Sequence, residues 1–153
     1  MGGLYSVVCI LTSDICFMKR RKAREFALQI LFQGDFKDEK IDRKDLEEFW
    51  SDKKVDGNIK EFAEELVRGT LSKLDEIDRI IEKVAENWLL KRMAAVDRNI
   101  LRFAAYEILY RKDIPSAVTI NEAIEIAKKF SSSEAAPFIN GILDRLAKQE
   151  GKV

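Results

Sequence analysis

The stretch from Val96 to Phe130 constrains the fold most, because it reads as two helices joined by an Asp-Ile-Pro turn. In its first half, an aliphatic stripe and an aromatic stripe repeat side by side at helical spacing. A helix with two apolar faces must be covered on both by other elements, so this one belongs at the centre of the molecule. The stripes consist of Ile100, Leu101, Ala104, Ala105, Ile108 and Leu109, and of Phe103, Tyr106 and Tyr110.

The second half, after Pro115, predicts a helix with one dry face. Thr119 and Glu122 have the three-residue spacing of a capping box, in which both side chains pair with free backbone amides at the helix start. We therefore expect Glu122 on the solvated side. The apolar stripe is Ile120, Ala123, Ile124 and Ala127, and Asn121, Glu122, Glu125, Lys128 and Lys129 lie opposite it.

The 153 residues carry 27 basic and 27 acidic side chains and no histidine. A chain of this size is expected to form one domain with a substantial core. Balanced charge excludes a surface that is basic throughout, so any nucleic-acid site must be a local cluster. Without histidine, the usual catalytic triads and most zinc sites are excluded, and we expect neither metal nor cofactor. No run of about 18 apolar residues occurs, so we expect a cytoplasmic protein without a membrane contact.

The basic run from Lys19 to Arg24, called the basic arm below, opens a predicted helix. The apolar stripe of this helix is Ala23, Phe26, Ala27, Ile30 and Leu31, and the opposite face carries Arg21, Arg24, Leu28 and Phe32. Cations beside an aromatic ring suit single-stranded RNA, whose phosphates need positive charge and whose bases stack. The arm also fits a solvated helix end with Phe32 packed on a neighbour, so the residues alone leave both interpretations open.

The other segments predict further helices. Asp42 is placed to cap a short helix. A longer helical pattern follows, with an apolar stripe that continues to Trp88. Gly69 and the cap-like spacing of Ser72 and Asp75 indicate a break into two helices, and a single long helix is the alternative. Pro137 is expected in or near the first turn of the last helix, where its missing N–H costs nothing.

Carboxylates are frequent, but nothing in the sequence brings two of them together for acid–base chemistry. They alternate with the apolar stripes, which places them on solvated helix faces. Since neither a nucleophile with its base nor a phosphate-binding loop occurs, we interpret the protein as a binder and not as an enzyme. The carboxylates considered are Glu64, Glu65, Asp75, Glu76 and Asp78.

Four segments together resemble one family, the bacterial transcription antitermination factors of the NusB family. Residues 20–32 read R-R-K-A-R-E-x-A-L-Q-x-L-F, and residues 97–107 read D-x-x-I-L-R-x-A-x-Y-E. Residues 113–130 read D-I-P-x-x-V-x-I-N-E-A-I-E-x-A-K-x-F, and residues 138–144 read F-I-N-G-I-L-D. Their order and spacing extend the resemblance from Met18 to the C-terminus.

The resemblance implies an all-α fold of about seven helices in two packed helical bundles, within a single RNA-binding domain of residues 18–150. It also implies a function. Similar proteins bind the boxA element of ribosomal RNA leaders together with the ribosomal protein NusE. They join the elongating RNA polymerase with other Nus factors, suppress termination, and assist ribosomal RNA maturation.

Carried over by position, the resemblance implies an RNA surface and a partner surface. The RNA surface would comprise Lys19, Arg20, Arg21, Lys22, Arg24, Gln29, Phe32, Phe130, Glu134 and Phe138. The partner surface would comprise Asp97, Arg98, Arg102 and Glu107. The run Ser131-Ser132-Ser133 departs from the glycine and charge of relatives in a loop of the RNA surface.

Residues 1–17 also depart from the family pattern. They lack the basic residues that begin a secretory signal, and Met18 stands directly before the basic arm. We therefore expect residues 1–17 to be an extension that comes from a misassigned start.

Two other functions are compatible with the sequence. A helical adaptor that binds only proteins would use the basic arm for solubility, and RNA binding at physiological salt separates it from the RNA-binding function. An RNA-modifying enzyme would carry this fold beside a methyltransferase domain, which this sequence does not include.

Overall fold

The computed structural model describes residues 2–37 and 40–150, and over these residues it contains seven α-helices, one short 3₁₀ helix and no strand. The predicted all-α class, with about seven helices, is therefore confirmed. The helices are α1 (Gly2–Asp35), α2 (Arg43–Trp50), α3 (Gly57–Ser72), α4 (Leu74–Val84), the 3₁₀ helix η1 (Leu90–Arg92), α5 (Ala95–Tyr110), α6 (Ser116–Phe130) and α7 (Ala135–Gln149).

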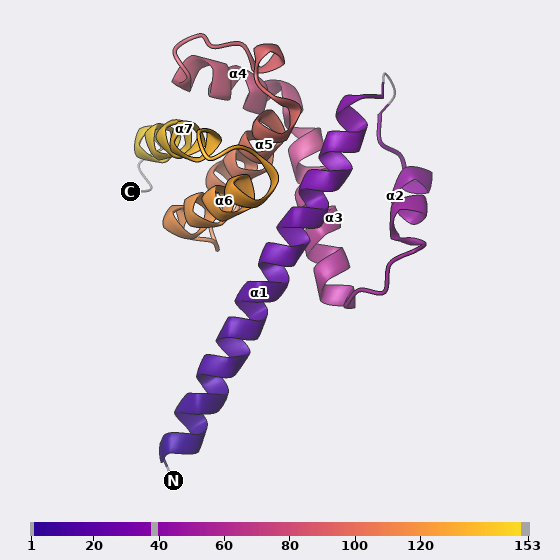
Figure 1. Cartoon of the computed structure of the whole chain (residues 1–153), viewed down its shortest axis with the longest axis vertical. Coiled ribbons are helices and arrows are strands. Elements are labelled where there is room, and N and C mark those ends of the chain that lie inside the picture. Colours follow the sequence, from indigo (N-terminus) through magenta and orange to yellow (C-terminus); the bar gives the residue numbers. More distant parts are fainter. Residues whose placement is uncertain (1, 38–39, 151–153) are drawn as a thin grey trace.

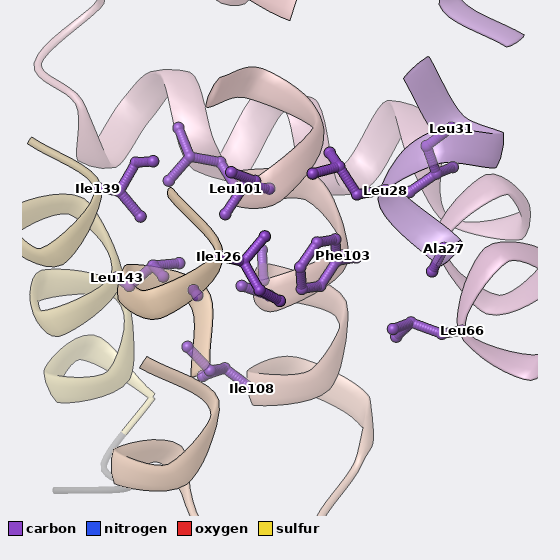
Figure 2. Packing of buried hydrophobic residues seen from close by; sticks show 14 of the residues in the cluster. Ala27, Leu28, Leu31, Leu66, Leu101, Phe103, Ile108, Ile126, Ile139 and Leu143 are labelled. Carbon is purple, nitrogen blue, oxygen red and sulfur yellow. The ribbon is translucent and has the colours of Figure 1, made fainter. Parts of the chain in front are cut away.

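Helices α1 to α3 form one group and α4 to α7 form another (Figure 1). Helix α5 belongs to the second group and lies at the boundary with the first. Helix α5 packs against α1, α3, α4, α6 and α7, which confirms its predicted central position. Figure 2 shows Phe103 of α5 between Leu28 of α1 and Ile126 of α6. The two apolar faces of α5 are therefore covered by different groups of helices.

Helix α1 is buried on two sides as well, because it packs against both α3 and α5. Arg24 and Leu28 are 1% and 3% exposed, although the sequence predicted them on the face opposite the apolar stripe. Part of the face that we predicted to be open to RNA therefore lies in the core. The N-terminal half of α1, which includes residues 2–17, extends away from the other helices (Figure 1).

Most of the helix starts that the sequence predicts are observed in the structure. Asp42 caps α2 in a reciprocal capping box with Asp45, and Pro137 lies in the first turn of α7, as predicted. The predicted capping box of α6 is wrong, because this helix begins earlier, at Ser116. Thr119 and Glu122 are buried and bind other helices instead.

The predicted continuation of the α4 stripe to Trp88 is also wrong. Helix α4 ends at Val84, and Glu86 and Asn87 then adopt φ angles of 57° and 67°. This left-handed turn redirects the chain, so Trp88 leaves the dry face and is 55% exposed. The predicted break between α3 and α4 does occur, at Lys73.

None of the helices in the described residues is both long and apolar enough to cross a membrane.

Candidate nucleic-acid interface

The basic arm lies within α1, so its cations point in different directions around the helix. Lys19 binds Asp56, the residue that caps α3, at 2.9 Å. Arg20 lies over the ring of Phe62 of α3, with its guanidinium carbon 5.2 Å from the ring centre. Both side chains are only partly buried and lie where α1 crosses the start of α3.

Arg24 and Glu107 have no surface to offer a ligand, which corrects both sequence-based assignments. The Arg24 guanidinium donates two hydrogen bonds to the Glu107 carboxylate, at 2.6 and 2.8 Å, and both side chains are buried. Thr119 of α6 donates a further hydrogen bond of 3.3 Å to Glu107. These residues connect α1, α5 and α6 inside the molecule, and their role is structural.

Arg21 is partly exposed, and its guanidinium is paired with a buried carboxylate. It donates hydrogen bonds of 2.7 and 2.9 Å to Glu122, whose side chain is fully buried, while its own side chain is 39% exposed. The hydrogen bond with Glu122 raises the pKa of Arg21 above its usual value. The paired guanidinium is therefore fixed in one orientation, with one edge open to solvent.

Glu25 connects the basic arm to the C-terminal end of α6. Its nearly buried carboxylate lies 3.5 Å from Lys22 and 3.1 Å from Lys129. Lys129 in turn lies over the ring of Phe130, with its amine 5.3 Å from the ring centre, and that ring is 36% exposed. The structure thus brings Phe130 close to the basic arm, although more than 100 residues separate them in sequence.

Gln29 and Phe32 lie farther along α1 and are both partly buried. Phe32 makes an edge-on contact with Phe36, with ring centres 5.0 Å apart. A helix rises about 1.5 Å per residue, so Phe32 is roughly 20 Å from Lys19 along the helix axis. A single nucleotide cannot contact Phe32 and the start of the arm together.

Glu134 and Phe138 line a shallow hollow of about 270 Å³ between η1 and the start of α7. The hollow also contains Asp97, which accepts a hydrogen bond of 2.5 Å from Ser131. Trp88 completes it, with its ring centre 5.8 Å from that of Phe138. The sequence pattern placed Trp88 in the core, and only the turn before it reveals its exposure.

Arg98 and Arg102, both predicted to bind a partner, surround Asp35 at the end of α1. Arg98 binds Asp35 at 2.5 Å, and Arg102 binds it at 3.3 Å while it also holds Asp78 of α4 with two hydrogen bonds of 2.9 Å. Asn99 donates to Asp35 at 3.0 Å. This network ties α1, α4 and α5 together, and no local pattern in the sequence identified Asp35.

Burial raises the pKa of Asp35, but the hydrogen bonds from Arg98 and Asn99 and the charge of Arg102 outweigh it. The pKa of this carboxyl is therefore below its usual value. The carboxylate stays ionised at neutral pH and partly neutralises two arginines, which leaves the surface around Arg98 close to balanced charge.

Among the described residues, no group of three or more carboxylates and cysteines is arranged to hold a metal ion. Two candidate binding surfaces are therefore left: the cations beside the exposed ring of Phe130, and the aromatic hollow at Phe138. Both border the connection between α6 and α7.

Comparison with known proteins gives a consistent result. The model of the NusB family matches residues 21–148. The transcription antitermination protein NusB of Thermodesulfovibrio yellowstonii is 52% identical over 142 residues, which cover 87% of this chain and 94% of that protein. Its counterpart from Desulfitobacterium hafniense is 54% identical over 137 residues, which cover 88% of this chain and 92% of that protein.

Solved structures match the fold over the same region. NusB from T. maritima aligns with a TM-score of 0.78 and 45% identity, covering 85% of this chain and 91% of its own. A crystal structure of the antitermination factors NusB and NusE with double-stranded RNA aligns with a TM-score of 0.78 and 27% identity, covering 86% of this chain and 98% of the matched one.

Proposed function

Because this chain belongs to the NusB family, we propose that it is an RNA-binding antitermination factor that recognises the boxA element of ribosomal RNA leaders together with the ribosomal protein NusE. In this function it joins the elongating RNA polymerase with other Nus factors in the cytoplasm, and contributes to ribosomal RNA synthesis and maturation. Residues 18–150 form the RNA-binding domain, without a catalytic role.

One observation carries the RNA-binding part of this proposal. Lys129 lies over the exposed ring of Phe130 and shares the nearly buried carboxylate of Glu25 with Lys22. Arg21 is held by the buried carboxylate of Glu122, which is on the same helix as Phe130. Fixed cations bind phosphates with little loss of side-chain freedom, and an exposed ring offers a surface for base stacking. These are the two requirements of a single-stranded RNA site.

The partner-binding part draws support from a relative. The aligned crystal structure contains NusB, NusE and RNA in one complex, which makes NusE the natural candidate for the surface near Arg98. On this chain, Arg98 and Arg102 of α5 both bind Asp35, the last residue of α1, and the exposed Phe36 follows Asp35 in sequence. Asp97, the third predicted partner residue at the start of α5, accepts a hydrogen bond from Ser131 instead. A hydrophobic ring within a charged rim is a common composition for a protein interface.

The experiment is a titration of the protein with a boxA-containing RNA and with a scrambled RNA of equal length, each with and without NusE. The proposal predicts tighter binding of the boxA RNA and a further gain when NusE is present. Equal affinity for both RNAs under all conditions would reject recognition of boxA. Binding of NusE without any RNA binding at physiological salt would favour the helical adaptor instead.

A further inference from the structure

Trp88 is an exposed ring that the fold places on the surface by a specific backbone turn. Non-glycine residues rarely adopt positive φ angles, yet Glu86 and Asn87 both do. The turn is held by a hydrogen bond of 2.8 Å from the Asn87 amide to the Glu82 carbonyl and by one of 3.2 Å from the Trp88 amide to the Ala85 carbonyl. The ring is therefore fixed at the surface by its own backbone.

The ring of Trp88 is supported on one side and open elsewhere. It leans on Phe138 at an interplanar angle of 60°. The hollow of about 270 Å³ lies on one side of it, and a second hollow of about 380 Å³ lies against Glu86, Asn87 and Arg92. Drug-sized ligands occupy pockets of about 300 to 1,000 Å³, and both hollows lie near or below the lower end of that range, so each has room for one small group.

The side chains around the ring define the group that fits. Arg92 is exposed and borders both hollows, while Asp97 and Glu134 line the smaller one. An aliphatic side chain of a protein would cover the two carboxylates without giving them a hydrogen bond, which is unfavourable. An arginine or lysine of a protein would meet the charge of Arg92.

A nucleotide fits the ring of Trp88, the two carboxylates and the positive charge of Arg92. Its base stacks on an indole ring, and its exocyclic amino group donates to a carboxylate, as cytosine does to Glu or Asp. Its phosphate then pairs with Arg92. Uracil has no exocyclic amino group and would leave the carboxylates unpaired.

We propose that Trp88, backed by Phe138, is a stacking platform for one unpaired RNA base that carries an amino group, with Asp97 or Glu134 accepting from that group and Arg92 binding the phosphate. This proposal rests on the proposed RNA-binding function and adds a base-reading site to it. The site lies beside the loop between α6 and α7. Glu134 and Phe138 already belong to the RNA surface that the family resemblance implies, and Trp88 and Arg92 extend that surface.

The test uses the full chain in a Trp50→Phe background, which leaves Trp88 as the sole tryptophan. Trp50 is buried and its indole N–H has no hydrogen-bond partner among the described residues, so phenylalanine removes no hydrogen bond there. The RNA that binds the parent protein is titrated while tryptophan fluorescence is recorded. Stacking of a base on Trp88 predicts quenching that saturates with RNA binding.

Affinity provides the second readout. Trp88→Ala should weaken RNA binding by about 5-fold to 150-fold, the range expected for one stacked base, and Trp88→Phe should recover part of the loss. Arg43→Ala is the control, because Arg43 is exposed on α2 and belongs to neither the RNA surface nor the partner surface. It should leave the affinity for RNA alone unchanged. Thermal unfolding should be nearly the same for all three variants.

Single replacements by uridine along the RNA identify the base. One position should weaken binding to the parent protein and have no further effect on Trp88→Ala. Unchanged affinity of Trp88→Ala with no quenching would overturn the platform and leave the proposed function intact. Loss of NusE binding with normal RNA binding would also overturn it, and would assign the ring to a protein. If the parent protein binds no RNA, the proposed function falls together with the platform.

Discussion

Arg24 of α1 and Glu107 of α5 form a two-hydrogen-bond ion pair in which both side chains are at most 2% exposed. Removing one partner leaves a buried charge without compensation, which costs about 3 to 5 kcal/mol. We predict that Arg24→Ala and Glu107→Ala each lower the free energy of unfolding by that amount, measured by urea denaturation.

The exposed pair of Arg43 and Glu47 on α2 is the matched control, since its atoms are only slightly farther apart, at 3.1 Å. Surface pairs contribute about 0 to 1 kcal/mol, so Arg43→Ala should have little effect on stability. The double variant Arg24→Met, Glu107→Leu should be less destabilised than either single variant, because no lone charge remains. Equal losses at the buried and the exposed pair would contradict this account of the core.

The environment of Asp35 predicts that the stability of the fold decreases at acidic pH. Its folded pKa lies below the ordinary value because Arg98, Asn99 and Arg102 outweigh the effect of burial. A carboxyl of this kind stabilises the fold above its unfolded pKa, at about 4, and the contribution is lost as the pH falls through the lower folded pKa. Urea denaturation at neutral pH and in steps below about pH 4 should therefore show a loss that Asp35→Asn reduces.

Asp144 on α7 provides the control for this experiment, because its partner is a single exposed lysine, Lys148. Asp144→Asn should leave the acid dependence of stability nearly as it is in the parent protein. An identical pH dependence for the parent and for Asp35→Asn would show that the network at the end of α1 does not contribute.

Much of the fold was predictable from local patterns. The two apolar stripes of α5 indicated a central helix, and Asp42 indicated the start of α2, because periodicity and capping depend on residues close in sequence. The buried ion pairs were not predictable in this way. Arg24 and Glu107 are separated by 83 positions, and no local pattern shows that the fold pairs them. The resemblance therefore assigned Arg24 to the RNA surface and Glu107 to the partner surface.

The candidate site divides along the same line. The basic arm was identified as a candidate from its charge run, which has a recognisable chemistry, whereas Phe130 was assigned to the RNA surface only by the family resemblance. Trp88 was misplaced because its exposure follows from the backbone conformation of Glu86 and Asn87, two residues that no turn motif marked. Glu122 was assigned to a cap because its true partner, Arg21, lies 101 positions away.

Gly69 is required for the close packing of α3 on α5. A Cβ atom at this position would overlap the ring and hydroxyl of Tyr106. Overpacking of this kind costs about 1 to 3 kcal/mol, so Gly69→Ala should lower the free energy of unfolding although alanine favours helices. Tyr106→Ala should remove the clash. The loss of unfolding free energy in the double variant Gly69→Ala, Tyr106→Ala should therefore be smaller than the sum of the losses in the two single variants.

The control for Gly69 is Gly57, the first residue of α3, where a Cβ atom would meet no other atom within 4 Å. Gly57→Ala should therefore be tolerated in the same urea denaturation assay. A loss at Gly57 equal to that at Gly69 would point to the backbone and not to Tyr106.

The salt dependence of RNA binding tests how many cations of the basic arm reach phosphates. With Arg24 buried, Lys19, Arg20, Arg21 and Lys22 remain at the surface. Each phosphate contact on a single strand adds about −0.7 to the slope of log affinity against log salt, so four contacts give about −2.8. Affinity should then fall roughly fifty-fold between about 50 and 200 mM salt.

Arg21→Ala should make that slope shallower by about 0.7, because Arg21 carries the guanidinium that Glu122 holds at the surface. Arg43→Ala, an exposed arginine on α2, should leave the slope unchanged and controls for net charge. The measurement is the affinity for boxA RNA at four or more salt concentrations for each variant. A slope for Arg21→Ala equal to that of the parent would remove Arg21 from the RNA surface, and a parent slope near zero would remove the whole arm.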